Sequence, residues 1–381
     1  MHVLYSFPDG IGKPGIGTTA LNQVREVAAH VERVTLYCTS LHGELPANVR
    51  VVQTLSVFGR RVPHRALGVG RSYRYHDARV ASALRRLADV DVVHCWPRAT
   101  LRTCAAARRR RIPCLREVPN THTAHAYAVV ARERASLGLA PIADHSHTFD
   151  AAALRREERE YAAADALLVP SEYALRTFVE RGVPRPKLVL HRYGYDERRF
   201  SVNGARATSP RPFTAIFVGR CEPRKGLHHA LRAWQSSGAS EGGRFIVCGA
   251  MEPDYGRVLA PLLAHPSIEL HGFVADPAAL MRESDVLVFP SLEEGSALVT
   301  YEAQACGCVL LVSEATGARC RDAVDGLVHR PGDVDALTEH LRVLSRDPAT
   351  LRRLRDESIR ASRGLSWRDA GRELAEIYAR A

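Results

Sequence analysis

The sequence predicts an α/β protein made of two doubly wound domains, each with a parallel sheet covered by helices on both faces. Short apolar runs alternate with helical patterns along most of the chain, which is typical of parallel sheets. The 381 residues are enough for two domains with full hydrophobic cores. A stretch of linker composition, SVNGARATSPRP, occupies residues 201–212. We therefore place the first domain at residues 1–200 and the second at 201–365.

The first domain is expected to begin with a buried strand at residues 3–6 and a helix that runs to about Val31. Thr18 or Thr19 is expected to cap this helix. The loop before it contains Gly15 and Gly17, and glycine lets a backbone pass close to a ligand because no Cβ is in the way. An isolated G-x-G is also common in ordinary turns, so both interpretations stay open. Further strands are expected at 34–38, 49–54, 90–94, 112–118, 166–169 and 188–191.

The stretch from Arg116 to Asp150 is unusual because four histidines follow the carboxyl end of a predicted strand. They are His122, His125, His145 and His147. None belongs to an H-E-x2-H pattern, so we do not predict a metal site. One interpretation of this stretch is that it is an acceptor-binding loop in which the histidines have no role in binding or catalysis. After it, Ser171 is expected to cap a helix.

The second domain is expected to open with a buried strand at residues 213–218, followed by a turn that carries Arg220 and Lys225. These cations could be ordinary surface charges. At the carboxyl end of a strand and five residues apart, they could also grip one diphosphate from different sides. Later strands are expected at 245–249, 268–270, 286–289 and 309–312, and helices at 333–345, 348–363 and 367–381.

Two glutamates lie between the last two predicted strands. Glu294 is in a loop at a strand's carboxyl end, where open α/β sheets bind ligands. A helix is expected to start near Ser296, with the Ser296 hydroxyl as its cap. Glu302 would lie on the apolar side of this helix, opposite Thr300 and Gln304.

A buried Glu302 carboxylate needs a partner. Either an arginine forms a structural ion pair with it, or a ligand with vicinal hydroxyls donates two hydrogen bonds to it. The first-turn amides between the two glutamates carry partial positive charge, which suits a phosphate group. A sugar diol, a phosphate and a ribose diol in a row describe a nucleotide sugar.

The spacing Glu294-x7-Glu302, with PSLEEG before it and EAQACG after it, resembles the signature of the family 4 retaining glycosyltransferases, which have the GT-B fold. The resemblance implies that Glu294 holds hydroxyls of the donor sugar and that Glu302 holds the nucleotide ribose. The family pattern E-G-F-G reads Glu294-Gly295-Ser296-Ala297 here. Amides at Gly295, Ser296, Ala297 and Leu298 would still meet the donor, but the shape around the sugar changes.

The same resemblance implies roles for other residues. Arg220 and Lys225 match the family motif G-R…K-G, whose two cations bind the donor pyrophosphate. Phe273 and Val274 would touch the nucleotide base, although Phe273 could equally belong to the core. In the first domain, the loop with Gly15 and Gly17 would lie under the diphosphate, and either Glu117 or His122 would lie by the donor sugar.

The resemblance also implies two Rossmann-like domains that face each other across a cleft, with a helix at residues 366–381 that crosses back onto the first domain. The expected reaction moves a sugar from a nucleoside diphosphate sugar to a small-molecule or glycan acceptor, with retention. No cofactor and no metal are expected, because Arg220 and Lys225 neutralise the leaving diphosphate. The alternatives are a GT-B epimerase or phosphorylase, or a non-catalytic sugar-nucleotide-binding module.

Composition narrows the partners and the compartment. The formal net charge is +11, but arginines alternate with glutamates, as in RREEREY (155–161), so nucleic acid is not expected. No run of 18 apolar residues exists, so contact with a membrane would be at its surface. The N-terminal MHVLYSFPDG lacks a signal-peptide pattern. Nine cysteines without a C-x2-C pair suggest reduced thiols, and we expect a cytoplasmic protein.

Overall fold

The computed structural model describes residues 1–57, 60–61, 68–143, 146–202 and 211–381. His145 and most of the predicted linker, residues 203–210, lie outside the described residues. Two large parallel sheets form the framework, which confirms the predicted α/β class. Contacts divide the chain into a first unit (residues 1–123, 150–193 and 367–381) and a second unit (residues 124–149 and 194–366).

The sheet of the first unit has seven parallel strands in the order β11-β10-β9-β8-β1-β3-β5. Their bounds are β1 His2–Ser6, β3 Arg33–Cys38, β5 Val49–Gln53, β8 Val92–Cys95, β9 Cys114–Glu117, β10 Ala166–Val169 and β11 Leu188–Leu190. The predicted strands are all present, within about two residues at each end. Two small sheets were not predicted, and they pair β2 (Gly10–Ile11) with β4 (Ser40–Leu41) and β6 (Ser56–Val57) with β7 (Arg60–Arg61).

Helices bury both faces of this sheet. Val3 and Tyr5 of β1 pack in one core cluster, and Leu4 between them packs in the other, because successive strand residues point to opposite faces. The first cluster contains side chains of α1 (Ile16–Val27) and α14 (Trp367–Arg380). The second contains side chains of α3 (Val69–Leu84), α4 (Leu101–Arg109), α6 (Ala151–Ala163) and α7 (Glu172–Val179).

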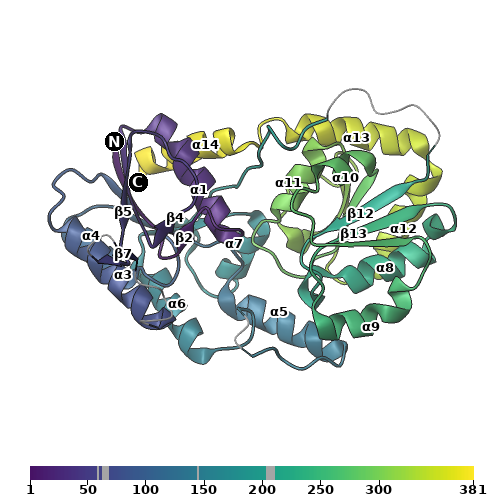
Figure 1. The fold of residues 1–381 in the computed structure, drawn as a ribbon, viewed down its shortest axis with the longest axis horizontal. Coiled ribbons are helices and arrows are strands. Elements are labelled where there is room, and N and C mark those ends of the chain that lie inside the picture. The colour runs from purple at the N-terminus through teal and green to yellow at the C-terminus, as the bar shows by residue number, and fades with distance from the viewer. Residues whose placement is uncertain (58–59, 62–67, 144–145, 203–210) are drawn as a thin grey trace. The chain divides into compact units, whose positions relative to one another are not determined.

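The last helix of the chain, α14, lies beside the first, α1 (Figure 1). Gly371 permits this approach, because a Cβ at that position would lie 2.7 Å from the backbone carbonyl carbon of Glu26. The contacts therefore group α14 with the first unit. The predicted domain boundaries near residues 200 and 365 remain predictions, since grouping by contacts does not test which segments fold on their own.

The sheet of the second unit has six parallel strands in the order β14-β13-β12-β15-β16-β17. Their bounds are β12 Thr214–Val218, β13 Arg244–Cys248, β14 Ile268–Gly272, β15 Val286–Phe289, β16 Val309–Ser313 and β17 Gly326–His329. Strand β17 was not predicted. Figure 1 shows one helical layer on each side of this sheet. One layer consists of α8 (Leu227–Ser236), α9 (Pro253–Leu263) and α12 (Val334–Arg346). The other consists of α10 (Ala278–Glu283), α11 (Leu298–Ala305) and α13 (Pro348–Ser362).

Helix α5 (Thr123–Ser136) occupies part of the histidine-rich stretch, and nearly all of it groups with the second unit. The interpretation of this whole stretch as a loop is therefore wrong. Buried apolar side chains on α5, such as Tyr127, Val129 and Val130, supply the physical reason. The sequence showed no clear apolar face here because these side chains do not recur with a strict helical period.

Of the helix N-caps predicted for the first domain, the one at Ser171 is confirmed and the one at Thr18 or Thr19 is not. Ser171 caps α7 as expected, since its Oγ accepts a hydrogen bond of 3.1 Å from the amide of Ala174. The expected cap of α1 by Thr18 or Thr19 is wrong. Gly15 is the N-cap residue, and the Thr18 hydroxyl donates instead to the carbonyl of Lys13 at 3.1 Å.

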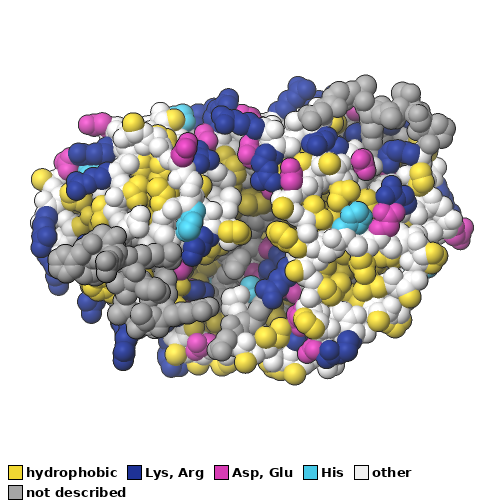
Figure 2. Space-filling model, viewed as in Figure 1, with side chains coloured by type: hydrophobic (Ala, Val, Ile, Leu, Met, Phe, Trp, Pro, Cys, Tyr) yellow, Lys and Arg dark blue, Asp and Glu magenta, His cyan; other side chains and the backbone are white. Residues whose placement is uncertain are grey.

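Figure 2 shows how charged side chains are distributed on one face of the molecule. On the face drawn in Figure 2, Lys and Arg side chains are spread over the surface and interspersed with Asp and Glu. Among the helices that the structure describes, none combines the length and hydropathy needed to span a bilayer.

Candidate functional site

Two loops of the second unit lie side by side because their strands are neighbours. Strands β12 and β15 pair in parallel, with Ala215 opposite Val286, so their carboxyl ends meet at one edge of the sheet. Gly226 ends the first loop with φ +73°, and a Cβ there would lie 2.2 Å from the carbonyl oxygen of Pro290 in the second loop. This contact requires glycine and fixes the loops against each other.

Lys225 and Glu294 meet where these loops touch. The Lys225 ammonium forms an ion pair with Oε1 of Glu294, and Ser291 donates to the same oxygen at 3.3 Å. Burial lowers the pKa of Lys225 well below its ordinary value; neighbouring Arg224 lowers it further, while Glu222 and Glu293 oppose the shift. The structure thus brings together two residues that the sequence assigned to one site.

Arg224 is a site residue that the sequence analysis missed. Its Nε lies 3.0 Å from Oε1 of Glu222, and its Nη1 lies 3.1 Å from Oε2 of Glu293 and 3.3 Å from Oε2 of Glu294. Nη1 also donates to the backbone carbonyl of Glu293 at 2.7 Å. All four side chains are buried. The signal in the sequence was the adjacent pair Glu293-Glu294, because two neighbouring carboxylates need a cation when they are buried.

Arg220 differs from Arg224 in exposure. Its side chain is 58% exposed, and its closest carboxylate oxygen, in Glu222, lies 3.6 Å from Nε. A guanidinium in this position can turn toward a ligand without breaking a buried network. The two arginines therefore have different roles. Arg224 connects the two loops through its glutamate partners, and Arg220 remains accessible to a ligand.

Glu302 lies on α11, and the structure changes its predicted surroundings. Thr300 and Gln304, expected on the polar face, are buried, while Glu302 is partly exposed. The buried polar side chains find backbone acceptors, because Thr300 Oγ1 donates to the carbonyl of Ala297 at 2.7 Å and Gln304 Nε2 donates to the carbonyl of Arg319 at 3.4 Å. Within the described parts of the chain, the Glu302 carboxylate makes no hydrogen bond or ion pair, so the arginine ion pair, one of the two alternatives for Glu302, is not found among these residues. Burial raises the pKa of Glu302 to about 7, although the charge of Arg199 opposes the shift.

The start of α11 also differs from the prediction. Ala297, not Ser296, is the N-cap residue, and no side chain caps the helix. The Ser296 hydroxyl lies 2.7 Å from the Tyr301 hydroxyl instead. The amide of Ala297 donates to the carbonyl of Thr316 at 2.9 Å, so it is already used. The amides of Ser296 and Leu298 have no acceptor among the described residues, and they are the ones that can receive a phosphate oxygen.

The segment after β14 presents an apolar side chain to solvent. Phe273 is 78% exposed, so the interpretation of Phe273 as a core residue is wrong. Val274, next to it, is half-buried. An exposed phenylalanine beside a sheet edge is available to stack on a flat ring.

In the first unit, Gly15 and Gly17 have different roles. Gly15 has φ +86° and precedes α1, and a Cβ there would meet nothing within 4 Å. Gly17 is buried, and a Cβ there would lie 2.7 Å from the carbonyl oxygen of Gly10. Local packing therefore explains Gly17, while the space next to Gly15 is open.

Glu117 lies at the end of β9 in a buried polar network. Its carboxylate accepts a hydrogen bond of 2.8 Å from the Tyr193 hydroxyl and one of 3.2 Å from Gln23, and lies 3.2 Å from Nε2 of His94. Burial alone would raise the pKa of Glu117, but the neighbouring histidines His94 and His191 and the hydrogen bonds leave it lowered.

His122 is also buried, and its ring packs edge-on against Phe178 at a centroid distance of 5.1 Å. The structure places Glu117 and His122 in the first unit and the residues around Lys225 in the second. That one of the two lies by a donor sugar stays a prediction.

Comparisons with known proteins match both halves of the chain to glycosyltransferase families. Residues 14–199 match "Glycosyltransferase Family 4", and residues 212–347 match "Glycosyl transferases group 1". A curated relative, the D-inositol 3-phosphate glycosyltransferase of Streptomyces bingchenggensis, is 27% identical over 316 residues, which is 76% of this chain. The match spans 66% of that relative, just under two thirds of its length.

Solved structures share the fold across the whole chain. The sucrose-phosphate synthase of Thermosynechococcus elongatus has a TM-score of 0.70 at 16% identity and covers 100% of this chain and 98% of that one. Anabaena Alr3699/HepE, solved in complex with UDP, has a TM-score of 0.69 at 17% identity and covers 100% of both chains. At these identities the likeness shows the GT-B fold.

Proposed function

The chain belongs to glycosyltransferase family 4 and has the GT-B fold, and from this premise we propose that it transfers a sugar from a nucleoside diphosphate sugar to an acceptor hydroxyl. We further propose that the anomeric configuration is retained and that no metal takes part in the chemistry. The observation that carries the proposal is the meeting of Lys225 with Glu294 beside the exposed Arg220.

The cations would hold the donor diphosphate. Arg220 can reach a phosphate from solvent, and Lys225 can share its three N–H groups between Glu294 and a phosphate oxygen. The amides of Ser296 and Leu298 add two neutral donors. Together these groups would stabilise the negative charge that develops on the leaving diphosphate, which is the role a metal would otherwise have.

The glutamates would hold the two diols of the donor. Glu294, fixed by Lys225 and Arg224, would accept hydrogen bonds from the transferred sugar. Glu302, whose carboxylate has no partner among the described residues, would accept them from the ribose. Phe273 would stack on the base. These assignments follow the family resemblance, and the geometry of the second unit supports them.

For the reaction itself we propose attack on the face from which the diphosphate departs. The bond from the anomeric carbon to the phosphate oxygen breaks, and a bond to the acceptor oxygen forms. The acceptor proton passes to the departing phosphate oxygen. This route needs no nucleophile from the protein, and none of the site residues above is assigned that role.

Among donors, a uridine diphosphate sugar is the first to test, because Alr3699/HepE has been solved with UDP and with UDP-glucose. We propose a small-molecule or glycan acceptor, no nucleic-acid partner, and a cytoplasmic location with at most surface contact with a membrane.

The deciding experiment is a thermal shift of the purified protein with UDP, GDP, ADP and dTDP, each with and without magnesium. We expect stabilisation by one diphosphate, unchanged by magnesium. The matching sugar nucleotide is then incubated with acceptors, and the anomeric configuration of the product is read by NMR. Stabilisation that needs magnesium would contradict the metal-independent site. Turnover of the donor with no acceptor, or with inorganic phosphate in its place, would instead indicate an epimerase or a phosphorylase.

A further inference from the structure

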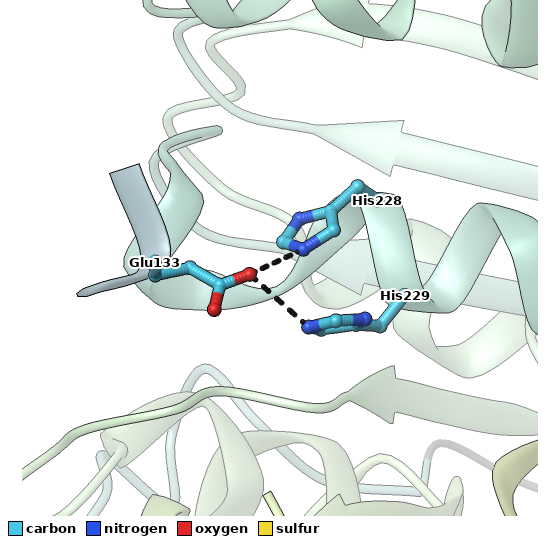
Figure 3. Close-up of side chains that lie close together, drawn as sticks. All are labelled: Glu133, His228 and His229. Carbon is cyan, nitrogen blue, oxygen red and sulfur yellow. Dashed lines mark hydrogen bonds and ion pairs between the residues drawn. The ribbon is translucent and has the colours of Figure 1, made fainter. Parts of the chain in front are cut away.

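Glu133, His228 and His229 form a compact cluster in the second unit, outside the residues discussed above (Figure 3). Glu133 comes from α5, and the two histidines come from the first turn of α8. Oε1 of Glu133 lies 2.7 Å from Nε2 of His228 and 3.3 Å from Nε2 of His229. We propose that this cluster binds one zinc ion or a similar divalent transition-metal ion.

The ligand set is chemically suited to zinc. Two imidazole nitrogens and one carboxylate oxygen are common zinc ligands, whereas magnesium and calcium prefer oxygen ligands. Ligand atoms around a tetrahedral zinc ion are about 3.3 Å apart. Glu133 and His229 already have this separation, and Glu133 and His228 would need to move apart by only about half an ångström. The fourth position would remain for water.

Tyr255 supports His228 from behind. The Tyr255 hydroxyl lies 2.6 Å from Nδ1 of His228 and accepts the backbone N–H of His228 at 2.9 Å. Metal-binding histidines usually donate their second ring N–H to such a partner, which fixes the tautomer and the ring orientation. A proton on Nδ1 leaves the lone pair of Nε2 directed at the cluster.

His229 gives a second, independent indication. Both of its ring nitrogens are buried, and neither has a hydrogen-bond partner within the described residues. The approach of Nε2 to Glu133 is an ion pair only if the imidazole is protonated. A buried imidazole without a partner is costly, and a metal ion would satisfy Nε2 without requiring that charge.

The position of Glu133 is fixed by its neighbour. Arg134 forms a buried ion pair with Glu252, the N-cap residue of α9, with 2.7 Å between Nη1 and Oε1. Because α5 is already anchored there, the Glu133 carboxylate is held opposite α8 before any ion arrives. The ion would link α5 to α8 at His228, which lies three residues after Lys225. We therefore assign it a structural role, separate from the chemistry of transfer.

The experiment uses tag-free protein that has been stripped with EDTA and kept reduced, with zinc alone as the probe and no nucleotide. Bound zinc is measured by elemental analysis after gel filtration, its affinity by competition with a chromophoric chelator, and its effect on folding by thermal shift. The d–d absorption of added Co²⁺ reports the coordination number. We expect one zinc per chain and a higher melting temperature.

Glu133→Gln and His229→Gln should each weaken zinc binding at least about tenfold. The loss should be larger for Glu133→Gln, because Glu133 is the anionic member of the ligand set and its charge offsets the helix dipole at the start of α8. His271→Gln is the matched control. It removes a histidine that lies 3.6 Å from the carboxylate of Glu269 at the surface, and it should bind zinc like the original protein.

Circular dichroism first establishes that each variant is folded. If His229→Gln does not fold, Glu133→Gln alone decides, because glutamine preserves the shape of the glutamate. Absence of zinc binding would overturn the proposal. Equal binding by Glu133→Gln and the original protein would also overturn it, since the zinc would then sit on cysteines or elsewhere. Neither result bears on sugar transfer, because the assay contains no donor.

Discussion

The ammonium of Lys225 pairs with the carboxylate of Glu294 across 69 residues of sequence, at the point where the loops after β12 and β15 touch. This pair joins the cation expected to bind phosphate to the carboxylate expected to bind sugar. A bound donor should therefore take over part of the hydrogen bonding between Lys225 and Glu294. Lys225 should affect recognition of the diphosphate, and Glu294 should affect recognition of the sugar.

Lys225→Ala should weaken nucleoside diphosphate binding by about tenfold or more, because a charge-assisted hydrogen bond to phosphate is lost. Isothermal titration calorimetry measures the affinity. Lys187→Ala is the control, since Lys187 lies in the first unit and its ammonium donates to the carbonyl of Ala162 at 2.9 Å. Unchanged affinity in both Lys225→Ala and Glu302→Ala would refute the proposed site.

Glu294→Gln should separate sugar recognition from diphosphate binding. Affinity for the free diphosphate should stay the same or rise, because Lys225 is released from its ion pair. Transfer from the intact sugar nucleotide should fall by about a hundredfold, since an oriented acceptor for the sugar hydroxyls is lost. Calorimetry and initial rates give the two quantities. Equal losses in both would mean that Glu294 acts only by holding Lys225.

Arg224→Ala should destabilise the fold by about 3–5 kcal/mol, because the buried carboxylates of Glu222 and Glu293 lose the guanidinium that lies 3.0 Å and 3.1 Å from them. Arg220→Ala is the matched control. Its side chain is 58% exposed, so the free energy of unfolding should change by less than about 0.5 kcal/mol while diphosphate affinity falls. Urea denaturation measures both variants. Similar stabilities would contradict the division of roles between the two arginines.

Glu302→Gln should stabilise the ligand-free protein at pH 8 and have little effect at pH 4. Below its ordinary pKa of 4.5, Glu302 is protonated in both the folded and the unfolded state and contributes nothing. As the pH rises toward the folded-state pKa of about 7, only the unfolded chain releases the proton, so the penalty for folding grows and then levels off. Its upper limit is about 3 kcal/mol.

Urea denaturation at the two pH values measures this difference, and an equal effect at both would show that ionisation of Glu302 is not its source. The same variant should bind the diphosphate more weakly at pH 8, because the ribose loses its carboxylate acceptor. If Glu302→Gln is more stable but binds the diphosphate more weakly, the Glu302 carboxylate contributes to ligand binding at a cost in folding stability.

The strands and the general location of the site could be predicted from the sequence. Short runs such as Val286–Phe289 are apolar at every position and are closed by Pro290, which is typical of a strand buried on both faces. Arg220, Lys225 and Glu294 lie in the loops that follow such runs, which places them beyond the carboxyl ends of strands. The order of strands in each sheet was not predicted, but neighbouring positions for β12 and β15 follow the rule for doubly wound sheets.

Only the tertiary structure decided the details, because they depend on contacts between residues that are far apart in the chain. The Ala297 amide donates to the carbonyl of Thr316, and no pattern in the sequence indicates that pairing. Glu133 meets His228 across 95 residues, and no spacing in the sequence indicates that contact.

The physical reason for this division is the range of the interactions. Periodicity and turn chemistry act over a few residues, so the sequence determines strands, most helices and the loops that carry Lys225 and Glu294. Partners of buried charges are chosen by packing between loops and helices. For that reason only the structure shows that Arg224 holds three glutamates, Glu222, Glu293 and Glu294, and that Glu302 has no partner among the described residues.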